Sequence, residues 1–131
     1  MDLILNENEF KENEIIIKKC KNNQKILYHQ NGIYLIGIPL KIENYIIVHQ
    51  TNKYLTLNIS KSKQYDVLKK IDEYFHKKFK KLSYHKFLNK NKNIRIKKNN
   101  NINYTVENSI YITINNIKYK NSFITIQLFT I

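Results

Sequence analysis

The chain has few of the residues on which cross-linked scaffolds and phosphate-binding loops depend. Its 131 residues include one cysteine, two glycines, one proline and neither tryptophan nor alanine. The single cysteine, Cys20, excludes an intramolecular disulfide and favours an intracellular, reducing compartment. The two glycines, Gly32 and Gly37, are isolated, which excludes a glycine-rich loop that cradles phosphates.

Groups of catalytic or metal-binding residues are also missing. The four histidines are scattered and Cys20 has no partner thiol, so no spacing typical of a metal site occurs. Asp72 and Glu73 are adjacent on an expected helix and point to different faces, which predicts solvated ion-pair partners and not a catalytic carboxylate pair. We therefore predict a protein that is not an enzyme and has no cofactor.

The uncharged runs and the first residues predict neither a membrane span nor a secretory signal. No uncharged run has the length that a membrane span needs. Met1 to Phe10 is acidic and lacks the basic start of a secretory signal. Hydrophobic residues make up 42% of the chain, which argues against full disorder and allows one domain with an adequate core.

Acidic residues are few, and the charges are separated into blocks. The chain carries 23 Lys or Arg and 10 Asp or Glu, for a net charge of +13. Five acids fall in the first fourteen residues, whereas Lys61 to Lys98 holds fourteen basic residues and three acids. This distribution predicts an acidic N-terminal arm over residues 1–13 and a basic domain over 14–131. Unpaired ammonium groups are too costly to bury, so the basic block must meet solvent or a polyanion, and nucleic acid is the first partner to test.

Most of the chain alternates with period two, which is typical of strands. Asn31-Gly32 predicts a hairpin, Gly37 and Pro39 predict a bulge or sheet edge, and Asn115-Asn116 predicts a further bulge. The expected strands cover Glu14–Cys20, Gln24–Gln30, Ile33–Ile38, Ile42–Gln50, Lys53–Ser60, Asn93–Lys97, Ser109–Tyr119 and Ser122–Ile131.

One helix is expected at about residues 62–82, with Ser60 or Ser62 as its cap and Asp66 in its first turn. Its apolar stripe has spacings of 3, 4, 4 and 3 residues. The stripe consists of Leu68, Ile71, Phe75, Phe79 and Leu82. Together the patterns predict a mainly β fold: an antiparallel OB-like β-barrel with one amphipathic helix packed on it.

Tyrosine and phenylalanine are abundant next to the basic residues, at ten and six copies. Tyr54 and Tyr111 each lie opposite an apolar row on their own strands, so their rings are candidates for stacking on bases. Arg95 can pair with phosphate through two N–H groups and also stack on a base. The candidate nucleic-acid-binding residues are Lys53, Tyr54, Arg95, Lys97, Lys98, Tyr111, Lys118, Tyr119 and Lys120.

Three segments resemble a known family. They are Ile38-Pro39-Leu40-Lys41 with the strand Tyr54–Ile59, the helix core Leu68–Tyr74, and the closing strands Ile112–Ile117 and Phe123–Leu128. Together they resemble the OB-fold single-stranded-DNA-binding proteins of large DNA viruses and phages. The resemblance implies binding of single-stranded DNA in preference to RNA, a role in viral DNA replication or recombination, and a location in the host nucleus or cytoplasm. A homodimer or other replication proteins are further candidate partners.

Two other readings of the sequence stay open. The basic, Asn-rich stretch Asn89–Asn103 would suit a ribosomal-type protein that inserts a loop into folded RNA. Alternatively, the high content of Ile, Asn and Lys reflects AT-rich codons, and the lysines have no binding role. The protein would then be a structural or interaction protein, with self-assembly through the apolar strand edge near Ile124–Ile131.

Overall fold

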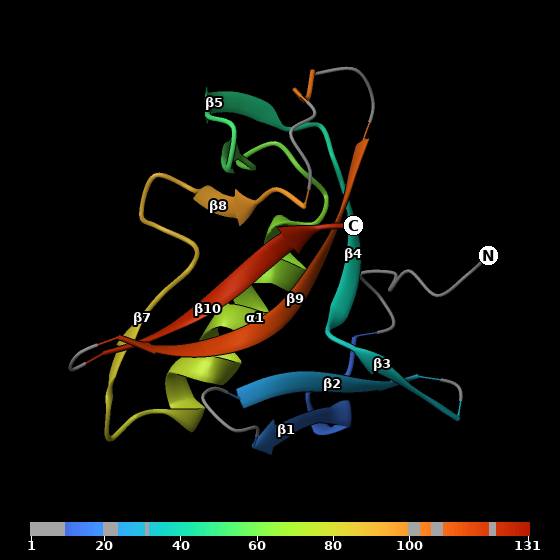
Figure 1. Ribbon diagram of the computed structural model, residues 1–131, viewed down its shortest axis with the longest axis vertical. Helices are drawn as coiled ribbons and strands as arrows, with labels where there is room; N and C mark the ends of the chain where they lie inside the picture. Colours follow the sequence, from blue (N-terminus) through green and yellow to red (C-terminus); the bar gives the residue numbers. More distant parts are fainter. Residues whose placement is uncertain (1–9, 20–23, 31, 100–102, 106–108, 121–122) are drawn as a thin grey trace.

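The computed structural model describes residues 10–19, 24–30, 32–99, 103–105, 109–120 and 123–131. These residues form a mainly β fold with one α-helix (Figure 1). The coarse fold class predicted from the sequence is therefore confirmed. In chain order the elements are a 3-10 turn η1 (Glu12–Glu14), β1 (Ile15–Lys19), β2 (Gln24–Gln30), β3 (Ile33–Ile36), β4 (Ile38–Glu43), β5 (Ile46–Gln50), β6 (Tyr54–Asn58), α1 (Tyr65–Lys78), β7 (Ser83–His85), β8 (Asn93–Lys97), β9 (Ser109–Lys120) and β10 (Phe123–Thr130).

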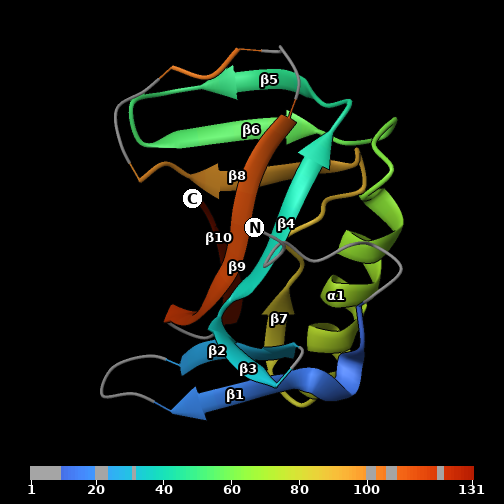
Figure 2. The same ribbon diagram turned by 90° about the vertical axis from the view of Figure 1, so that its right-hand side faces the viewer.

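All ten strands belong to one sheet, whose longest path is β1-β2-β9-β10-β8-β6-β5. In Figure 2, β5, β6 and β8 lie side by side at one end, the β1–β2 hairpin lies at the other, and β9 and β4 run between them. β10 runs parallel to β7 and β8, so the prediction of purely antiparallel strands is wrong. The reason is that β9 returns antiparallel to β10 and so restores the direction of β8.

The sheet is open, so the predicted closed barrel is also wrong. Residues 42–50 were expected to form one strand, but the chain breaks at Asn44, where φ is +54°. β4 then pairs with β9 and β5 pairs with β6. β4 and β5 therefore pair with different strands, and the hydrogen-bonded pairing does not continue in a closed ring.

Two local predictions on irregular backbone are confirmed. Gln127 pairs with Asn116 and Leu128 pairs with Ile114, which leaves Asn115 as the extra residue of a bulge. Gly37 separates β3 from β4 with φ at +89°, and a Cβ at this position would collide with the side chain of Thr113. β2 and β3 form the predicted hairpin, with Gly32 at φ +80°, while Asn31 lies outside the described residues.

The helix is shorter than predicted. Four residues of its apolar stripe are buried, but Leu82 is 54% exposed because α1 ends at Lys78. The N-cap is Gln64 and not a serine. The hydroxyl of Ser62 donates to Gln64 Oε1 at 2.8 Å, and the backbone N–H of Glu43 donates to the same oxygen at 2.9 Å. The side chain of Gln64 thus ties the start of α1 to the end of β4.

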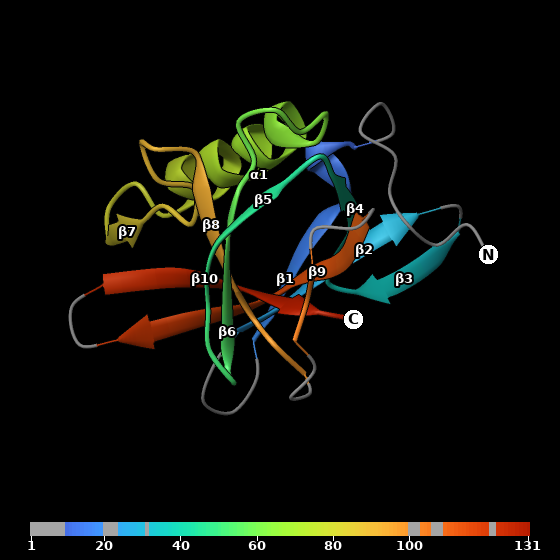
Figure 3. The ribbon, with the colours of Figure 1, turned by 90° about the horizontal axis from the view of Figure 1, so that it is seen from above.

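The buried apolar side chains form one cluster between the sheet and α1. Figure 3 shows α1 on one side of the sheet, where Val67, Leu68, Ile71 and Phe75 are buried. Because strand side chains alternate, the residues between the buried positions of β6, β8, β9 and β10 face away from this core. That outward side, here called the outer face, carries the candidate site.

The segment next to β1 packs on the domain. The ring of Phe10 stacks on Tyr28 with centroids 6.0 Å apart, and the N–H of Lys11 donates to the Tyr28 hydroxyl at 2.9 Å. Glu14 pairs with His29 at 2.9 Å. Residues 1–9 of the predicted acidic arm lie outside the described residues. Among the helical residues that the structure describes, none belongs to a helix long and apolar enough to cross a membrane.

Candidate functional site

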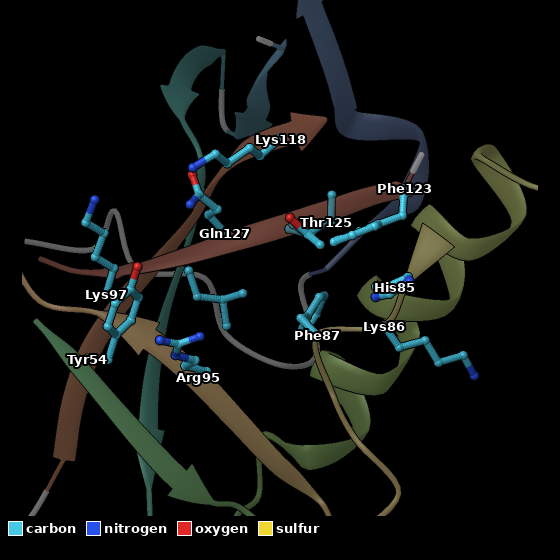
Figure 4. A pocket seen from close by; sticks show the side chains of 12 residues that line it. Tyr54, His85, Lys86, Phe87, Arg95, Lys97, Lys118, Phe123, Thr125 and Gln127 are labelled. Carbon is cyan, nitrogen blue, oxygen red and sulfur yellow. The ribbon is translucent and has the colours of Figure 1, made fainter. Parts of the chain in front are cut away.

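A hollow of about 340 Å³ opens on the outer face where β6, β8 and β10 meet the segment after β7 (Figure 4). Strand alternation brings its residues there: Tyr54, Arg95 and Thr125 flank the buried Leu55, Ile96 and Ile126. We call this hollow the aromatic groove. Its lining residues are Tyr54, His85, Lys86, Phe87, Arg95, Lys97, Lys118, Phe123, Thr125, Ile126, Gln127 and Leu128.

Tyr54 and Arg95 form one side of the aromatic groove. The guanidinium carbon of Arg95 lies 3.7 Å from the centre of the Tyr54 ring. In the β6–β8 register, Arg95 pairs with Thr56 and Lys97 pairs with Tyr54, so Arg95 reaches the tyrosine diagonally. An exposed cation–π contact stabilises by about 0.5–1 kcal/mol, and Arg95 is exposed.

His85 and Phe123 form the other side, as Figure 4 shows. Their ring centroids are 4.0 Å apart and their planes differ by 12°, which is a stacked arrangement. The parallel pairing of β7 with β10 sets this contact, because it places His85 opposite Thr125 and beside Phe123. The aromatic groove therefore has a stacked pair on each side.

Four cations surround these rings: Lys86, Arg95, Lys97 and Lys118. No Asp or Glu of the described chain lines the aromatic groove. Within the described ranges, the ion pair between Lys41 and Glu43 and the hydrogen bond between His29 and Glu14 lie elsewhere. Lys86 interacts electrostatically with the carboxylate of Asp72. Arg95, Lys97 and Lys118 form no ion pair with another described residue and are available to an anionic ligand.

The structure brings four of the nine predicted site residues into the aromatic groove: Tyr54, Arg95, Lys97 and Lys118. Lys53 is exposed in the turn before Tyr54 and does not line the hollow. Lys98 is only 6% exposed. Its ammonium donates to the carbonyl oxygen of Thr51 at 2.8 Å and lies 5.8 Å from the centre of the Tyr104 ring. This geometry gives Lys98 a structural contact and does not support the predicted contact to phosphate.

The other three predicted residues lie outside the aromatic groove. Tyr111 is 43% exposed on the outer face of β9, with the Lys41 ammonium 5.9 Å from its ring centre. Tyr119 donates its hydroxyl to Gln24 Oε1 at 2.8 Å, and it shares a face with the buried Ile124, opposite to that of Lys118. Lys120 ends β9, and its side chain lies outside the described part of the structure.

Sequence reasoning missed His85, Lys86, Phe87, Phe123 and Gln127 as site residues. The alternation of Phe123, Thr125 and Gln127 with the apolar Ile124, Ile126 and Leu128 was a signal for the last strand. No such signal exists for the three-residue strand β7, which is too short to show a period. Its position depends on pairing with β10, a contact between residues about forty positions apart.

Asp72 holds the segment that follows β7 in place, and its predicted role as a solvated ion-pair partner is wrong. The side chain is 3% exposed. Asp72 Oδ1 accepts from the Tyr84 hydroxyl at 2.6 Å and from the Phe87 N–H at 3.3 Å, and Oδ2 accepts from the Leu88 N–H at 3.2 Å. These bonds join α1 to the residues on either side of His85 and Lys86. Glu73, its neighbour, is exposed as predicted.

Burial changes the acid–base properties of this contact. Desolvation raises the pKa of Asp72, and the hydrogen bonds from Tyr84, Leu88 and Phe87 offset part of that effect. Desolvation also raises the pKa of Tyr84, and the nearby carboxylate of Asp72 adds to the rise. Tyr84 therefore remains a hydrogen-bond donor at neutral pH.

No group of three or more His, Cys, Asp or Glu side chains that could hold a metal ion occurs in the described ranges. No family model, curated protein or solved structure matches this chain. The candidate site is therefore defined by its geometry: two ring contacts and four cations around one hollow, three of the cations without an ion-pair partner among the described residues.

Proposed function

We propose that the chain is a non-catalytic protein that binds single-stranded nucleic acid, with DNA favoured over RNA, in the aromatic groove. The observation that carries the proposal is the pairing of Arg95 on Tyr54 and of His85 on Phe123 across one hollow that no described Asp or Glu lines. Rings supply stacking surfaces for bases, and the surrounding cations supply contacts for phosphates. This combination is what binding without base-specific hydrogen bonds needs.

The two kinds of contact have separable energies. Stacking of a base on an aromatic side chain is worth about 1–3 kcal/mol and tolerates any base. Each phosphate that a lysine or arginine neutralises on a single strand releases counterions and adds about −0.7 to the slope of log K against log salt concentration. A duplex can use the cations but keeps its bases stacked on each other, so the rings favour the single strand.

The resemblance to OB-fold proteins stays a prediction. OB folds are five-stranded, partly open Greek-key barrels that bind oligonucleotides on the face of their second and third strands. The sheet described here is open and has more strands. Here β6 and β8, which carry Tyr54 and Arg95, follow β5 in the order of pairing. One departure is α1, which lies between β6 and β8 in the chain. A role in viral DNA replication or recombination follows from this resemblance alone.

The test is fluorescence anisotropy of a labelled, mixed-sequence oligonucleotide of about 30 nucleotides, longer than typical single-domain sites. It is measured as single-stranded DNA, as RNA and as duplex across a salt series. The groove variant is Tyr54→Ala, and Tyr111→Ala is its matched control, because Tyr111 is also a strand tyrosine beside a cation. Loss of one stacking contact predicts a 5- to 150-fold weaker affinity for the groove variant, from about 1–3 kcal/mol.

We expect salt-sensitive binding that prefers the single strand, with the control unchanged. Equal, weak binding to single strand and duplex, insensitive to Tyr54→Ala, would contradict the proposal and favour lysines that reflect base composition. A preference for folded RNA over unstructured strands would favour the ribosomal-type alternative.

A further inference from the structure

A second basic hollow, of about 230 Å³, lies beside α1. We call it the helix hollow. It is lined by residues of α1 and of the segment between β7 and β8: Tyr65, Lys69, Asp72, Glu73, Lys86, Leu88, Asn89 and Lys90. We propose that the strand bound in the aromatic groove continues past Lys86 into the helix hollow, so that the nucleic-acid site has two parts. This inference rests on the proposed function.

Lys86 connects the two hollows. Its side chain lines both the aromatic groove and the helix hollow, so the two openings share one wall. The position of this wall is fixed by Asp72, whose carboxylate accepts from the N–H groups of Phe87 and Leu88. A polymer that occupies the groove next to Lys86 therefore lies beside the opening of the helix hollow.

The far side of the helix hollow is an ordered turn. The side-chain oxygen of Asn89 accepts from the N–H groups of Asn91 and Asn93 at 2.9 and 3.0 Å. The Asn58 amide donates to the Asn91 carbonyl oxygen at 2.9 Å, and Lys92 has φ +64°. This turn presents Lys90 at the hollow and places the ammonium of Lys92 4.9 Å from the centre of the Tyr65 ring.

The charges of the helix hollow suit a phosphodiester chain. Lys69, Lys86 and Lys90 are exposed; Lys69 lies on α1, and Lys86 and Lys90 lie in the segment between β7 and β8. Glu73 is the one exposed acid that lines this hollow within the described residues, whereas the oxygens of Asp72 face Tyr84, Phe87 and Leu88. Tyr65 adds a partly exposed ring. The same pairing of cations with an aromatic side chain as in the aromatic groove thus recurs at the adjoining site.

The test compares two lengths of oligothymidine, about 5 and about 20 nucleotides, which lie near the lower end and beyond the upper end of the usual range of about 4–16 per domain. The variant is Lys69→Gln with Lys90→Gln. The control is Lys18→Gln with Lys19→Gln, which removes the same charge from exposed lysines of β1 that line neither hollow. Affinity is measured by anisotropy across a salt series.

We expect the Lys69/Lys90 variant to bind the longer oligonucleotide more weakly, with a salt slope less steep by about 1.4 for two lost contacts, and to bind the shorter one like the unmodified protein. The Lys18/Lys19 control should resemble the unmodified protein at both lengths. Equal losses at both lengths, or no difference from the control, would overturn the two-part site and leave the aromatic groove alone. If the proposed function is wrong, the short oligonucleotide will not bind, or Tyr54→Ala will not weaken its binding. That result would overturn both the proposed function and the two-part site.

Discussion

The outer face of the sheet carries two tyrosine–cation contacts, and only one of them belongs to a hollow. Tyr54 and Arg95 line the aromatic groove together with a second stacked pair, whereas Tyr111 and Lys41 lie at 5.9 Å outside it. Lys41 is also paired with Glu43 at 3.4 Å, so its charge is partly compensated. The comparison shows that residue type does not distinguish the two places. What distinguishes them is the convergence of β6, β8, β10 and the segment after β7.

The largest expected effect comes from removing the contact that holds the groove wall. Asp72→Ala leaves the N–H groups of Phe87 and Leu88 and the Tyr84 hydroxyl without their acceptor. Because each unsatisfied buried donor costs about 1–3 kcal/mol, the free energy of unfolding should fall by at least that amount. Urea denaturation measures it.

The matched control for this change is Glu73→Ala, the exposed neighbour on the same helix, which should change stability by less than about 0.5 kcal/mol. Equal effects of the two substitutions would show that Asp72 does not hold the segment from Tyr84 to Leu88. Single-strand binding by the folded Asp72→Ala protein should weaken as well, while the Tyr111 region is unaffected.

The second prediction concerns Arg95→Lys, which replaces the tyrosine–arginine contact of the aromatic groove with a tyrosine–lysine contact like the one at Tyr111. Arg95→Lys keeps the charge but removes the planar group that lies on the Tyr54 ring. Single-strand affinity should fall about 2- to 5-fold, which corresponds to about 0.5–1 kcal/mol, and the salt slope should stay unchanged. Anisotropy titrations at several salt concentrations measure both quantities.

The converse substitution, Lys41→Arg, gives the Tyr111 region a Tyr–Arg contact of its own. If the hollow matters and not the pair, this variant gains no affinity. A gain as large as the loss in Arg95→Lys would argue that any tyrosine–arginine pair on this surface binds the strand.

The smallest expected effect is the pH dependence of the stability that Asp72 contributes. Because burial raises the folded-state pKa of Asp72 above its ordinary value of 3.8, the folded protein holds this proton more tightly than the unfolded chain. The stability from Asp72 is then fully present below its unfolded pKa and is lost as the pH rises through the folded pKa. Asp72→Asn removes this component, so the stability of the natural protein relative to Asp72→Asn should decrease with rising pH in that interval.

Denaturation curves of both proteins from acidic to neutral pH measure the difference, with Glu73→Gln as the exposed comparison. A constant difference across the interval would mean that the pKa of Asp72 is not raised by folding.

The elements themselves were largely predictable from sequence, and the reason is local geometry. Side chains of a strand alternate every residue, so Leu55 and Leu57 or Ile124 and Ile126 reveal their strands without knowledge of any partner. The apolar residues around Ile71 reveal the helix in the same way, because side chains three and four residues apart share one face of a helix. The predictions failed where backbone conformation overrides the pattern, as at Asn44, which splits one apolar run into β4 and β5.

The candidate site was predictable only in part. Tyr54 and Arg95 were found because each is exceptional on its own strand: a ring opposite an apolar row and the one arginine of the chain. Lys98 looked like its neighbour Lys97, and nothing in the sequence indicated that its ammonium would bond to the Thr51 carbonyl. Likewise, nothing in the sequence distinguished the buried Asp72 from the exposed Glu73 beside it. Burial of a charged group depends on which partners the fold brings to it, and those partners are distant in sequence.

The sequence by itself determined the mainly β character, the amphipathic helix, the bulge at Asn115 and the block of positive charge, because each follows from neighbouring residues. Only the tertiary structure decided that the sheet is open, that His85 meets Phe123, and that Asp72 is buried among Tyr84, Phe87 and Leu88. These outcomes depend on the register between strands far apart in the chain, and a local period carries no information about register.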